Sequence, residues 1–243
     1  MSSLIGSYNF TIDAYVTDFR GKATLPMISS FILQVATKHA EERGFGYSAM
    51  TAANRAWVLS RLVIEMFEYP EKEDELIVKT WVADVNKLFT ERCVSFEYAD
   101  GKKVGFARTI WAAIDMNTRR PMNVLELGGL ADYKTDNGLP IEGAKKIHSL
   151  KDVESTGKFT IRYSDIDING HLNSMKYIEH FVDMFDMEMF KAKEIYRFEI
   201  NYINEAHFGT RLKLYKKEEA ENVYVLEMKS DDAVISSCRV YWG

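Results

Sequence analysis

The sequence predicts an α+β fold in which one structural unit occurs twice, each copy being an antiparallel sheet wrapped around a long helix. Two observations predict it. A stretch with helix-spaced apolar residues precedes a run of alternating, strand-like segments, and the same order of patterns restarts in the second half of the chain. The 243 residues suit one large domain or two small ones.

The first copy opens with a strand and a helix. Residues 8–17 alternate between apolar and polar, and residues 25–43 carry apolar side chains at the helical period. Thr24 is expected to cap this helix, Pro26 suits its first turn, and Gly44 suits its end. The sequence therefore predicts a long helix with one apolar face.

Strand patterns follow this helix in both copies. In the first copy they cover residues 55–69, 75–84 and 90–116, the last as a hairpin turning at Asp100 and Gly101. The second copy shows strand, helix and four strands at residues 158–164, 173–185, 195–205, 210–218, 223–230 and 234–242. A helix that is apolar on one face must be covered, and a sheet wrapped around it satisfies both. This is the hotdog arrangement, and two such units make a pseudo-dimer in one chain.

Residue matches between the copies support the duplication. The stretch Arg61–Ile64 matches Arg197–Ile200, and Trp111 matches Trp242 at a slightly shorter separation along the chain. Such shifts in separation indicate different loop lengths. We expect an N-terminal unit at residues 1–130, a polar, irregular linker at residues 131–156, and a C-terminal unit at residues 157–243.

Composition excludes several classes of function. Hydrophobic residues make up 47% and charged residues 28%, as in soluble globular proteins. The net charge of −5 and the lack of a basic run argue against nucleic acid as a partner. No apolar stretch approaches the length of a membrane span, and the N-terminus lacks the pattern of a secretory signal.

The two cysteines indicate a reducing compartment. Cys93 and Cys238 belong to no CxxC pair and to no His/Cys spacing typical of zinc sites. We expect two buried thiols, no metal, no cofactor and a cytoplasmic protein.

The candidate site lies at the strand-to-helix junction of the second copy. Residues 164–177 read SDIDINGHLNSMKY, in which Asp167, Asn169 and His171 alternate. In an extended segment these side chains would share one face, where a carboxylate orients an imidazole and an amide holds a carbonyl or a water. The matching residues 17–26 of the first copy contain no histidine. This difference favours chemistry in the second copy.

A second carboxylate, Glu205, follows the strand after the helix, where Tyr69 stands in the first copy. By itself a glutamate at a strand end is usually just solvated. A structural role is preferred for Asp165, Asn173 and Ser174, because such residues commonly cap helices and form turns.

The residues resemble one family closely. Asp165–Ile178, DIDINGHLNSMKYI, resembles a segment of the acyl-acyl-carrier-protein thioesterases, a double-hotdog family of plant plastids and bacteria. The family's catalytic glutamate follows the motif histidine at a characteristic spacing, and Glu205 follows His171 at that same spacing. Segments of the first copy also resemble family segments in order, at residues 57–61, 69–70, 78–82 and 115–122.

The resemblance implies hydrolysis of a fatty acyl thioester on acyl carrier protein, releasing the free fatty acid and the carrier. The implied catalytic set is Asp167, Asn169, His171 and Glu205, with no cofactor; which carboxylate activates the water stays open. Plant members often have cysteine after the glutamate, whereas Ala206 stands here, which excludes a cysteine acyl-enzyme at that place. The lack of a plastid transit segment indicates a bacterial-type member.

The resemblance also suggests where the substrate binds. It places the acyl pocket in the N-terminal unit, and Met27, Phe31, Trp57 and Ile64 are either its lining or ordinary core. Because acyl carrier protein is acidic, a local basic patch is expected. Candidates for it are Lys102, Lys103, Arg119, Arg120, Lys145 and Lys146.

Other functions remain open at this point. A hotdog thioesterase acting on acyl-CoA would use the same chemistry. A dehydratase usually has a GHFP-like segment, whereas this chain has GHLN. A non-catalytic protein that binds acyl chains would be expected to lack the site residues. The oligomeric state, monomer or homodimer, is not determined by the pattern.

Overall fold

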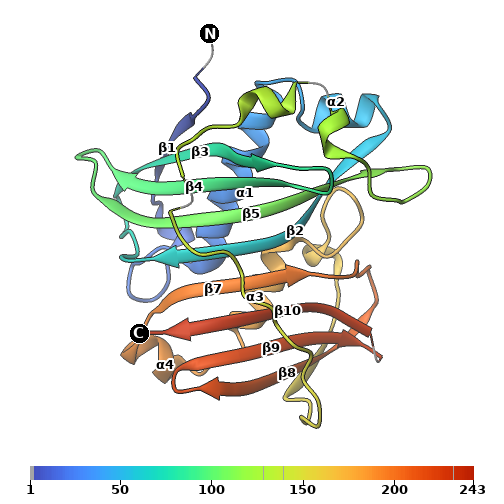
Figure 1. The fold of residues 1–243 in the computed structure, drawn as a ribbon. Helices are drawn as coiled ribbons and strands as arrows, with labels where there is room; N and C mark the ends of the chain where they lie inside the picture. The colour runs from blue at the N-terminus through green and yellow to red at the C-terminus, as the bar shows by residue number, and fades with distance from the viewer. Residues whose placement is uncertain (1–2, 128, 139, 232) are drawn as a thin grey trace. The chain divides into compact units, whose positions relative to one another are not determined.

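The computed structural model describes residues 3–127, 129–138, 140–231 and 233–243. It divides the chain into two units, Met1–Gly143 and Ala144–Gly243 (Figure 1). The elements of the first unit are β1 (Gly6–Thr11), η1 (Ala14–Val16), α1 (Leu25–Glu41), α2 (Tyr47–Ala52), β2 (Arg55–Met66), β3 (Glu75–Val85), β4 (Thr90–Tyr98), β5 (Lys103–Asp115), η2 (Val124–Glu126) and η3 (Leu130–Tyr133).

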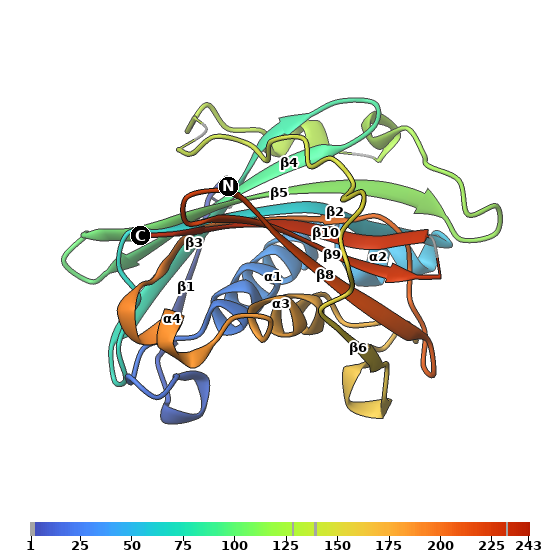
Figure 2. The same cartoon turned by 90° about the horizontal axis from the view of Figure 1, so that it is seen from below.

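The sheet of the first unit has the order β1-β3-β4-β5-β2, with every pair antiparallel. Helix α1 packs against β1 and β3, beneath the strands of this unit in Figure 2. The ring of Phe31 on α1 lies 4.6 Å from the ring of Phe10 on β1. The buried side of α1 is apolar, as its spacing predicts: Leu25, Ile28, Phe31, Ile32, Val35, Ala36 and Ala40.

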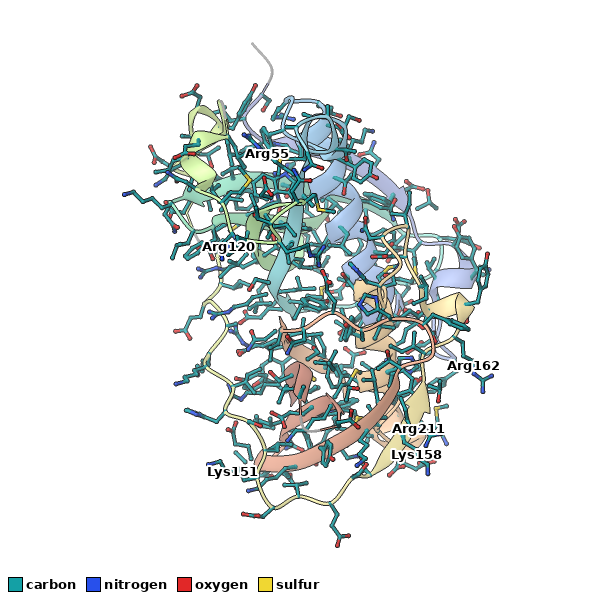
Figure 3. All side chains as sticks on the ribbon, turned by 90° about the vertical axis from the view of Figure 1, so that its right-hand side faces the viewer. Arg55, Arg120, Lys151, Lys158, Arg162 and Arg211 are labelled. Atoms are coloured by element: carbon teal, nitrogen blue, oxygen red, sulfur yellow. The ribbon has the colours of Figure 1, made fainter. Side chains whose placement is uncertain are left out.

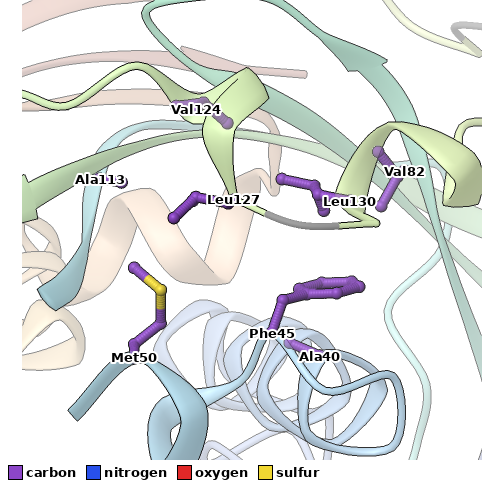
Figure 4. Close-up of a cluster of buried hydrophobic side chains, with 8 residues drawn as sticks. All are labelled: Ala40, Phe45, Met50, Val82, Ala113, Val124, Leu127 and Leu130. Atoms are coloured by element: carbon purple, nitrogen blue, oxygen red, sulfur yellow. The ribbon is translucent and has the colours of Figure 1, made fainter. Parts of the chain in front are cut away.

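A second apolar cluster joins the end of α1 to the segments around η2 and η3. Phe45 and Met50 from the α2 region pack together with Val124, Leu127 and Leu130 (Figure 4). Trp57 packs against this cluster, and its ring nitrogen donates to the carbonyl of Phe45 at 2.8 Å. The chain just after β5 therefore belongs to the core of the first unit.

The second unit repeats this architecture. Its elements are β6 (Gly157–Thr160), η4 (Tyr163–Asp165), α3 (Ser174–Val182), α4 (Met187–Ala192), β7 (Ile195–Tyr202), β8 (Arg211–Ala220), β9 (Val223–Ser230) and β10 (Ala233–Trp242). The strand order β6-β8-β9-β10-β7 is that of the first unit, element for element, and all pairs are antiparallel. The prediction of an α+β fold with two tandem hotdog units is confirmed.

Helix α3 supplies the core of the second unit. Tyr177, Ile178, Phe181 and Val182 form its buried side. Beyond its end, the ring of Phe185 contacts the rings of Tyr224 and Trp242 at 5.2 and 5.0 Å.

The expected linker is more ordered than its composition suggests. Its first residues form η3 and end within the first unit, where Arg108 donates to the carbonyl of Ile141 at 2.6 Å. The following segment crosses the sheet of the second unit in Figure 1. There the amide of Lys145 donates to the buried carboxylate of Glu199 at 2.9 Å, and Lys229 donates to the carbonyl of Leu150. Residues 131–156 are therefore not a free connection, because charged groups of the sheets bind their main chain.

Local predictions had mixed outcomes. Thr24 caps α1 by accepting from the amide of Met27, and Gly44 takes a left-handed φ of +78° beyond its end, as predicted. The first strand is shorter than residues 8–17, because the chain turns into η1 after Thr11. Helices α2 and α4, of six residues each, were not predicted; they are too short to show a clear period. In the part of the chain described, no helix is both long and apolar enough to cross a membrane.

Candidate active site

The motif residues form a tight turn and are not extended. The amide of Asp167 donates to the carbonyl of His171 at 2.8 Å, and the amide of Gly170 donates back to the carbonyl of Asp167 at 3.0 Å. Gly170 has a φ of +80°, a conformation that strongly favours glycine. The expectation that Asp167, Asn169 and His171 share one face of an extended segment is therefore wrong.

The carboxylate of Asp167 holds this turn together. Its Oδ1 accepts the amide of Asn169 at 2.8 Å and the amide of His171 at 3.1 Å. Asp167 therefore contacts the main chain of His171, and no described bond joins it to the imidazole. Asn169 is exposed at the tip of the turn.

The first unit contains the same turn without the histidine. Oδ1 of Asp18 accepts the amides of Arg20 and Lys22 at 2.8 and 3.2 Å, and the amide of Asp18 donates to the carbonyl of Lys22 at 2.8 Å. Gly21 has a φ of +78°. The aspartate and the glycine are thus structural in both copies. The polar side chains of the two turns differ: the second unit has Asn169 and His171 where the first has Arg20 and Lys22.

The structure brings His171 together with Glu205. Nε2 of the imidazole lies 3.4 Å from Oε2 of the carboxylate. The two side chains are 25% and 40% exposed, so that a substrate and a water have access to them. This separation is longer than a hydrogen bond of about 2.9 Å, as is common for catalytic pairs without substrate.

Main-chain bonds fix the relative position of this pair. The amide of Leu172 donates to the carbonyl of Ala206 at 2.8 Å, and His171 is paired antiparallel with His207. Leu172 directly follows His171, and Ala206 directly follows Glu205, so this bond lies next to both members of the pair. The first unit has the equivalent bond from Ala23 to the carbonyl of Pro70, also 2.8 Å.

His207 is a site residue that the sequence reasoning missed. Its ring lies edge-on to that of His171 at 4.9 Å, and its Nδ1 lies 3.4 Å from the carbonyl of Gly170. One ring nitrogen each of His171 and His207 and one carboxylate oxygen of Glu205 lie within 4.8 Å of one another. The spacing of Glu205 and His207, two residues apart, was the available signal.

The helix after the turn begins as predicted. The side chain of Asn173 accepts the amide of Met175 at 2.9 Å and so caps α3. Asp165 accepts the amide of Arg162 at 2.8 Å, another structural bond. The preference for structural roles at Asp165 and Asn173 is confirmed.

Tyr177 on α3 lies behind the pair. Burial raises the pKa of its hydroxyl, and the nearby carboxylates of Glu205 and Asp167 raise that pKa further. Tyr177 therefore stays protonated, and its ring packs edge-on against Tyr202 at 5.4 Å.

The cysteines are unsuited to nucleophilic chemistry. Cys93 and Cys238 are free and buried. Burial raises the pKa of Cys93 to about 12 and raises the pKa of Cys238 well above its usual value. Because the thiolate is the nucleophile, neither cysteine can supply an acyl-enzyme. The arrangement instead provides an imidazole–carboxylate pair beside a helix start, which suits activation of a water.

Comparison with known proteins gives matches over nearly the whole chain. A family model described as the acyl-ACP thioesterase N-terminal domain matches residues 6–127. A second, the acyl-ACP thioesterase C-terminal domain, matches residues 148–243. An acyl-ACP thioesterase structure from Bacteroides thetaiotaomicron is 39% identical, with a TM-score of 0.94, over 99% of this chain and 98% of that chain.

More distant proteins also match the chain, in fold or in sequence. The 12:0-ACP thioesterase from Umbellularia californica has the same fold, with a TM-score of 0.89 at 18% identity over 100% of this chain and 98% of that one. Oleoyl-acyl carrier protein thioesterase 2, chloroplastic, from Arabidopsis thaliana is 23% identical over 213 residues, which are 81% of this chain and 58% of the relative. The chain thus spans little more than half the length of such curated relatives.

Proposed function

The chain belongs to the acyl-acyl carrier protein thioesterase family, and we propose that it hydrolyses the thioester of fatty acyl-acyl carrier protein, releasing a free fatty acid and the carrier. The observation that carries this proposal is the His171–Glu205 pair, with 3.4 Å between Nε2 and the carboxylate. The first unit, with lysine and tyrosine at the equivalent positions, cannot form an imidazole–carboxylate pair there.

We propose that this pair is the general base. With the Nε2 proton directed to Glu205, the other ring nitrogen of His171 accepts a proton as water attacks the thioester carbonyl, and the carboxylate stabilises the imidazolium that forms. Collapse of the tetrahedral intermediate breaks the carbon–sulfur bond. The imidazolium returns its proton to the leaving thiolate, so that the pair ends the cycle in its starting state.

Asn169 and Asp167 have different parts in this proposal. Asn169, exposed at the tip of the turn, holds the thioester carbonyl or an amide of the pantetheine arm with its side-chain N–H groups. Asp167 acts through the turn, whose amides it binds, and so positions Asn169 and His171.

The proposal is tested by thiol release from acyl chains of several lengths, each carried on acyl carrier protein and on CoA. His171→Ala and Glu205→Gln should each lower turnover by about 10²–10⁴, the usual contribution of a general base. Unchanged thermal unfolding of the variants is the control. Preference for CoA would reassign the substrate, and acyl binding without hydrolysis by the unmodified protein would mean a binding protein.

We propose that the acyl chain lies against α1 in the first unit. Phe31 and Ile64 are buried there, whereas Met27 in the first turns of the helix is half-buried. Met27 is therefore better placed to meet a ligand than Phe31 or Ile64. Met27→Trp should shift the chain-length profile towards shorter acyl chains, because a larger side chain shortens the space available.

We propose that the carrier protein docks on a basic groove in the second unit. Lys158, Arg162 and Arg211 line this groove of about 520 Å³ and are grouped together in Figure 3. Their cationic groups are exposed and form no ion pair with any residue that the structure describes; the one carboxylate in the groove lining is Asp165, which binds the amide of Arg162. Such a surface complements an acidic partner.

The groove is connected to the catalytic pair through the main chain. The amide of Ile161 donates to Thr210 at 3.0 Å, next to Arg162 and Arg211, and the same two chain segments meet again where Leu172 binds Ala206. By contrast, two of the cations expected from sequence already have partners: Lys102 pairs with Glu68, and Lys103 with Glu97. The groove is therefore a better candidate for docking than Lys102 and Lys103.

A further inference from the structure

His171, Glu205 and His207 form a cluster of three metal-ligating side chains. Each offers one ligand atom, and the three atoms lie within 4.8 Å of one another. Two imidazoles with one carboxylate are a ligand set that zinc takes in proteins, with a water at the fourth position. The general-base proposal uses two of these residues and leaves His207 without a function.

The backbone holds the three residues on two anchored segments. His171 is paired antiparallel with His207, and the Leu172–Ala206 bond is adjacent to this pair. Glu205 and His207 are two residues apart in the chain, and a carboxylate oxygen of Glu205 and a ring nitrogen of His207 lie within 4.8 Å of each other and of a ring nitrogen of His171. The ligands therefore need only side-chain rotation to close on an ion.

The ring of His207 is prepared for ligation. Its Nδ1 faces the carbonyl of Gly170 at 3.4 Å, and since a carbonyl only accepts, Nδ1 carries the proton. The other nitrogen, Nε2, is then unprotonated and can bind a metal. A backbone carbonyl on the second nitrogen is how ligating histidines are commonly oriented.

We propose that His171, Glu205 and His207 bind one Zn²⁺ ion, or a similar transition-metal ion, and that the bound ion inhibits the enzyme. Zinc holds nitrogen and oxygen ligands at about 2.0–2.2 Å, so the ligand atoms must approach to roughly 3.3–3.5 Å. The partial exposure of His171 and Glu205 leaves room for this rotation. An ion bound there occupies both members of the catalytic pair; this inhibitory effect rests on the proposed function, whereas binding itself does not.

The two units differ at this place. Lys22, Tyr69 and Glu71 stand in the first unit where His171, Glu205 and His207 stand in the second. Lysine and tyrosine are poor zinc ligands at neutral pH, so one ion per chain is expected. Cysteine does not compete, because both thiols are buried.

The test measures metal binding directly. Zn²⁺ is titrated against a chromophoric chelator, and Co²⁺ is used as a visible-absorption probe of a low-coordinate site, both on the full chain stripped of metal. The unmodified protein should bind one equivalent of Zn²⁺. His207→Phe, which keeps an aromatic ring against His171, and His207→Gln, which keeps a donor to Gly170, should both weaken binding about tenfold or more. His148→Phe removes an exposed imidazole elsewhere and should bind as the unmodified protein does.

The outcomes separate the two proposals. Absence of stoichiometric binding, or equal binding by both His207 variants and the unmodified protein, overturns the metal site whether or not the protein hydrolyses thioesters. If the site exists, Zn²⁺ should inhibit hydrolysis with the measured dissociation constant, EDTA should reverse the inhibition, and each His207 variant should lose sensitivity relative to its own metal-free rate. Saturation with Zn²⁺ without inhibition would overturn the inhibitory part.

Discussion

The amide of His171 donates to Oδ1 of Asp167 at 3.1 Å, so the motif aspartate binds the main chain of the motif histidine. In the first unit the amide of Lys22 donates to Oδ1 of Asp18 at 3.2 Å. The unit without the imidazole thus keeps the bond. It follows that this bond builds the turn in both copies, and the second copy uses the turn to present His171 to Glu205.

Both aspartates should contribute to stability through the turn, and Asp18 should contribute slightly more, because its Oδ2 also accepts from the guanidinium of Arg20 at 2.7 and 2.9 Å. Asp167→Ala and Asp18→Ala each remove an acceptor from two amides, and each should lower the free energy of unfolding by about 1–2 kcal/mol. Asp167→Asn keeps an Oδ1 acceptor and should stay within about 0.5 kcal/mol of the unmodified protein. Urea unfolding measures all three; a loss for Asp167→Asn as large as that for Asp167→Ala would contradict the role in the turn.

The two turn glycines should separate stability from activity. Gly170 and Gly21 have φ values of +80° and +78°, and a Cβ added at either position would meet no neighbour within 4 Å. Gly170→Ala and Gly21→Ala should therefore cost about 1 kcal/mol each through backbone strain alone. Only Gly170→Ala should reduce kcat, because only its turn carries Asn169 and His171. Equal turnover by the two variants would show that the turn does not position the catalytic groups.

The basic groove should govern affinity for the carrier. Arg162→Ala and Arg211→Ala should each raise KM for acyl-acyl carrier protein roughly 3- to 10-fold at low salt and weaken the salt dependence, with kcat little changed. Acyl-pantetheine, a neutral substrate, should be hydrolysed as before. Arg55→Ala removes a cation of the first unit that does not line the groove, and it is the matched control. If Arg55→Ala raises KM as much as Arg162→Ala and Arg211→Ala do, the effect comes from the protein's net charge and not from docking at the groove.

Stability should fall in acid through His39. This buried residue accepts a hydrogen bond from Arg92 at Nδ1 (2.9 Å) and donates from Nε2 to the carbonyl of Leu4 (3.1 Å), so its neutral form is fully bonded. Burial, then the charges of Arg92 and Arg43, lower the pKa of His39 to about 3.

The sign of the effect follows from that shift. Below about pH 6.5 His39 becomes protonated in the unfolded chain but stays neutral in the folded protein. The contribution of His39 to the free energy of unfolding is therefore complete above about pH 6.5 and declines towards about pH 3. The slope is at most about 1.4 kcal/mol per pH unit. His39→Gln keeps an acceptor and a donor but does not titrate. Urea unfolding at pH 7.5, 6 and 5 should show a shallower decline for the variant; parallel curves would assign the acid sensitivity to other groups.

Much of the fold was predictable because local patterns and tertiary packing agree in it. The helical period of α1 and α3 and the alternation of the strands each mark one face for burial, and the structure buries those faces. Prediction failed for α2 and α4, where six residues give no period. The polar composition of residues 131–156 also gave no sign of their main-chain bonds to Glu199 and Arg108. Packing against the rest of a unit decides such segments, and no local pattern records it.

The sequence by itself determined the duplicated unit, the cap at Thr24, a cap at either Asn173 or Ser174, and the candidate residues Asp167, Asn169, His171 and Glu205. The tertiary structure decided how those residues are used. It turned the alternating motif into a hydrogen-bonded turn, paired His171 with Glu205, and added His207 to them. The physical reason is that a side chain's partners depend on where distant segments meet, here at the bond between Leu172 and Ala206, and residue spacing within either segment does not contain that information.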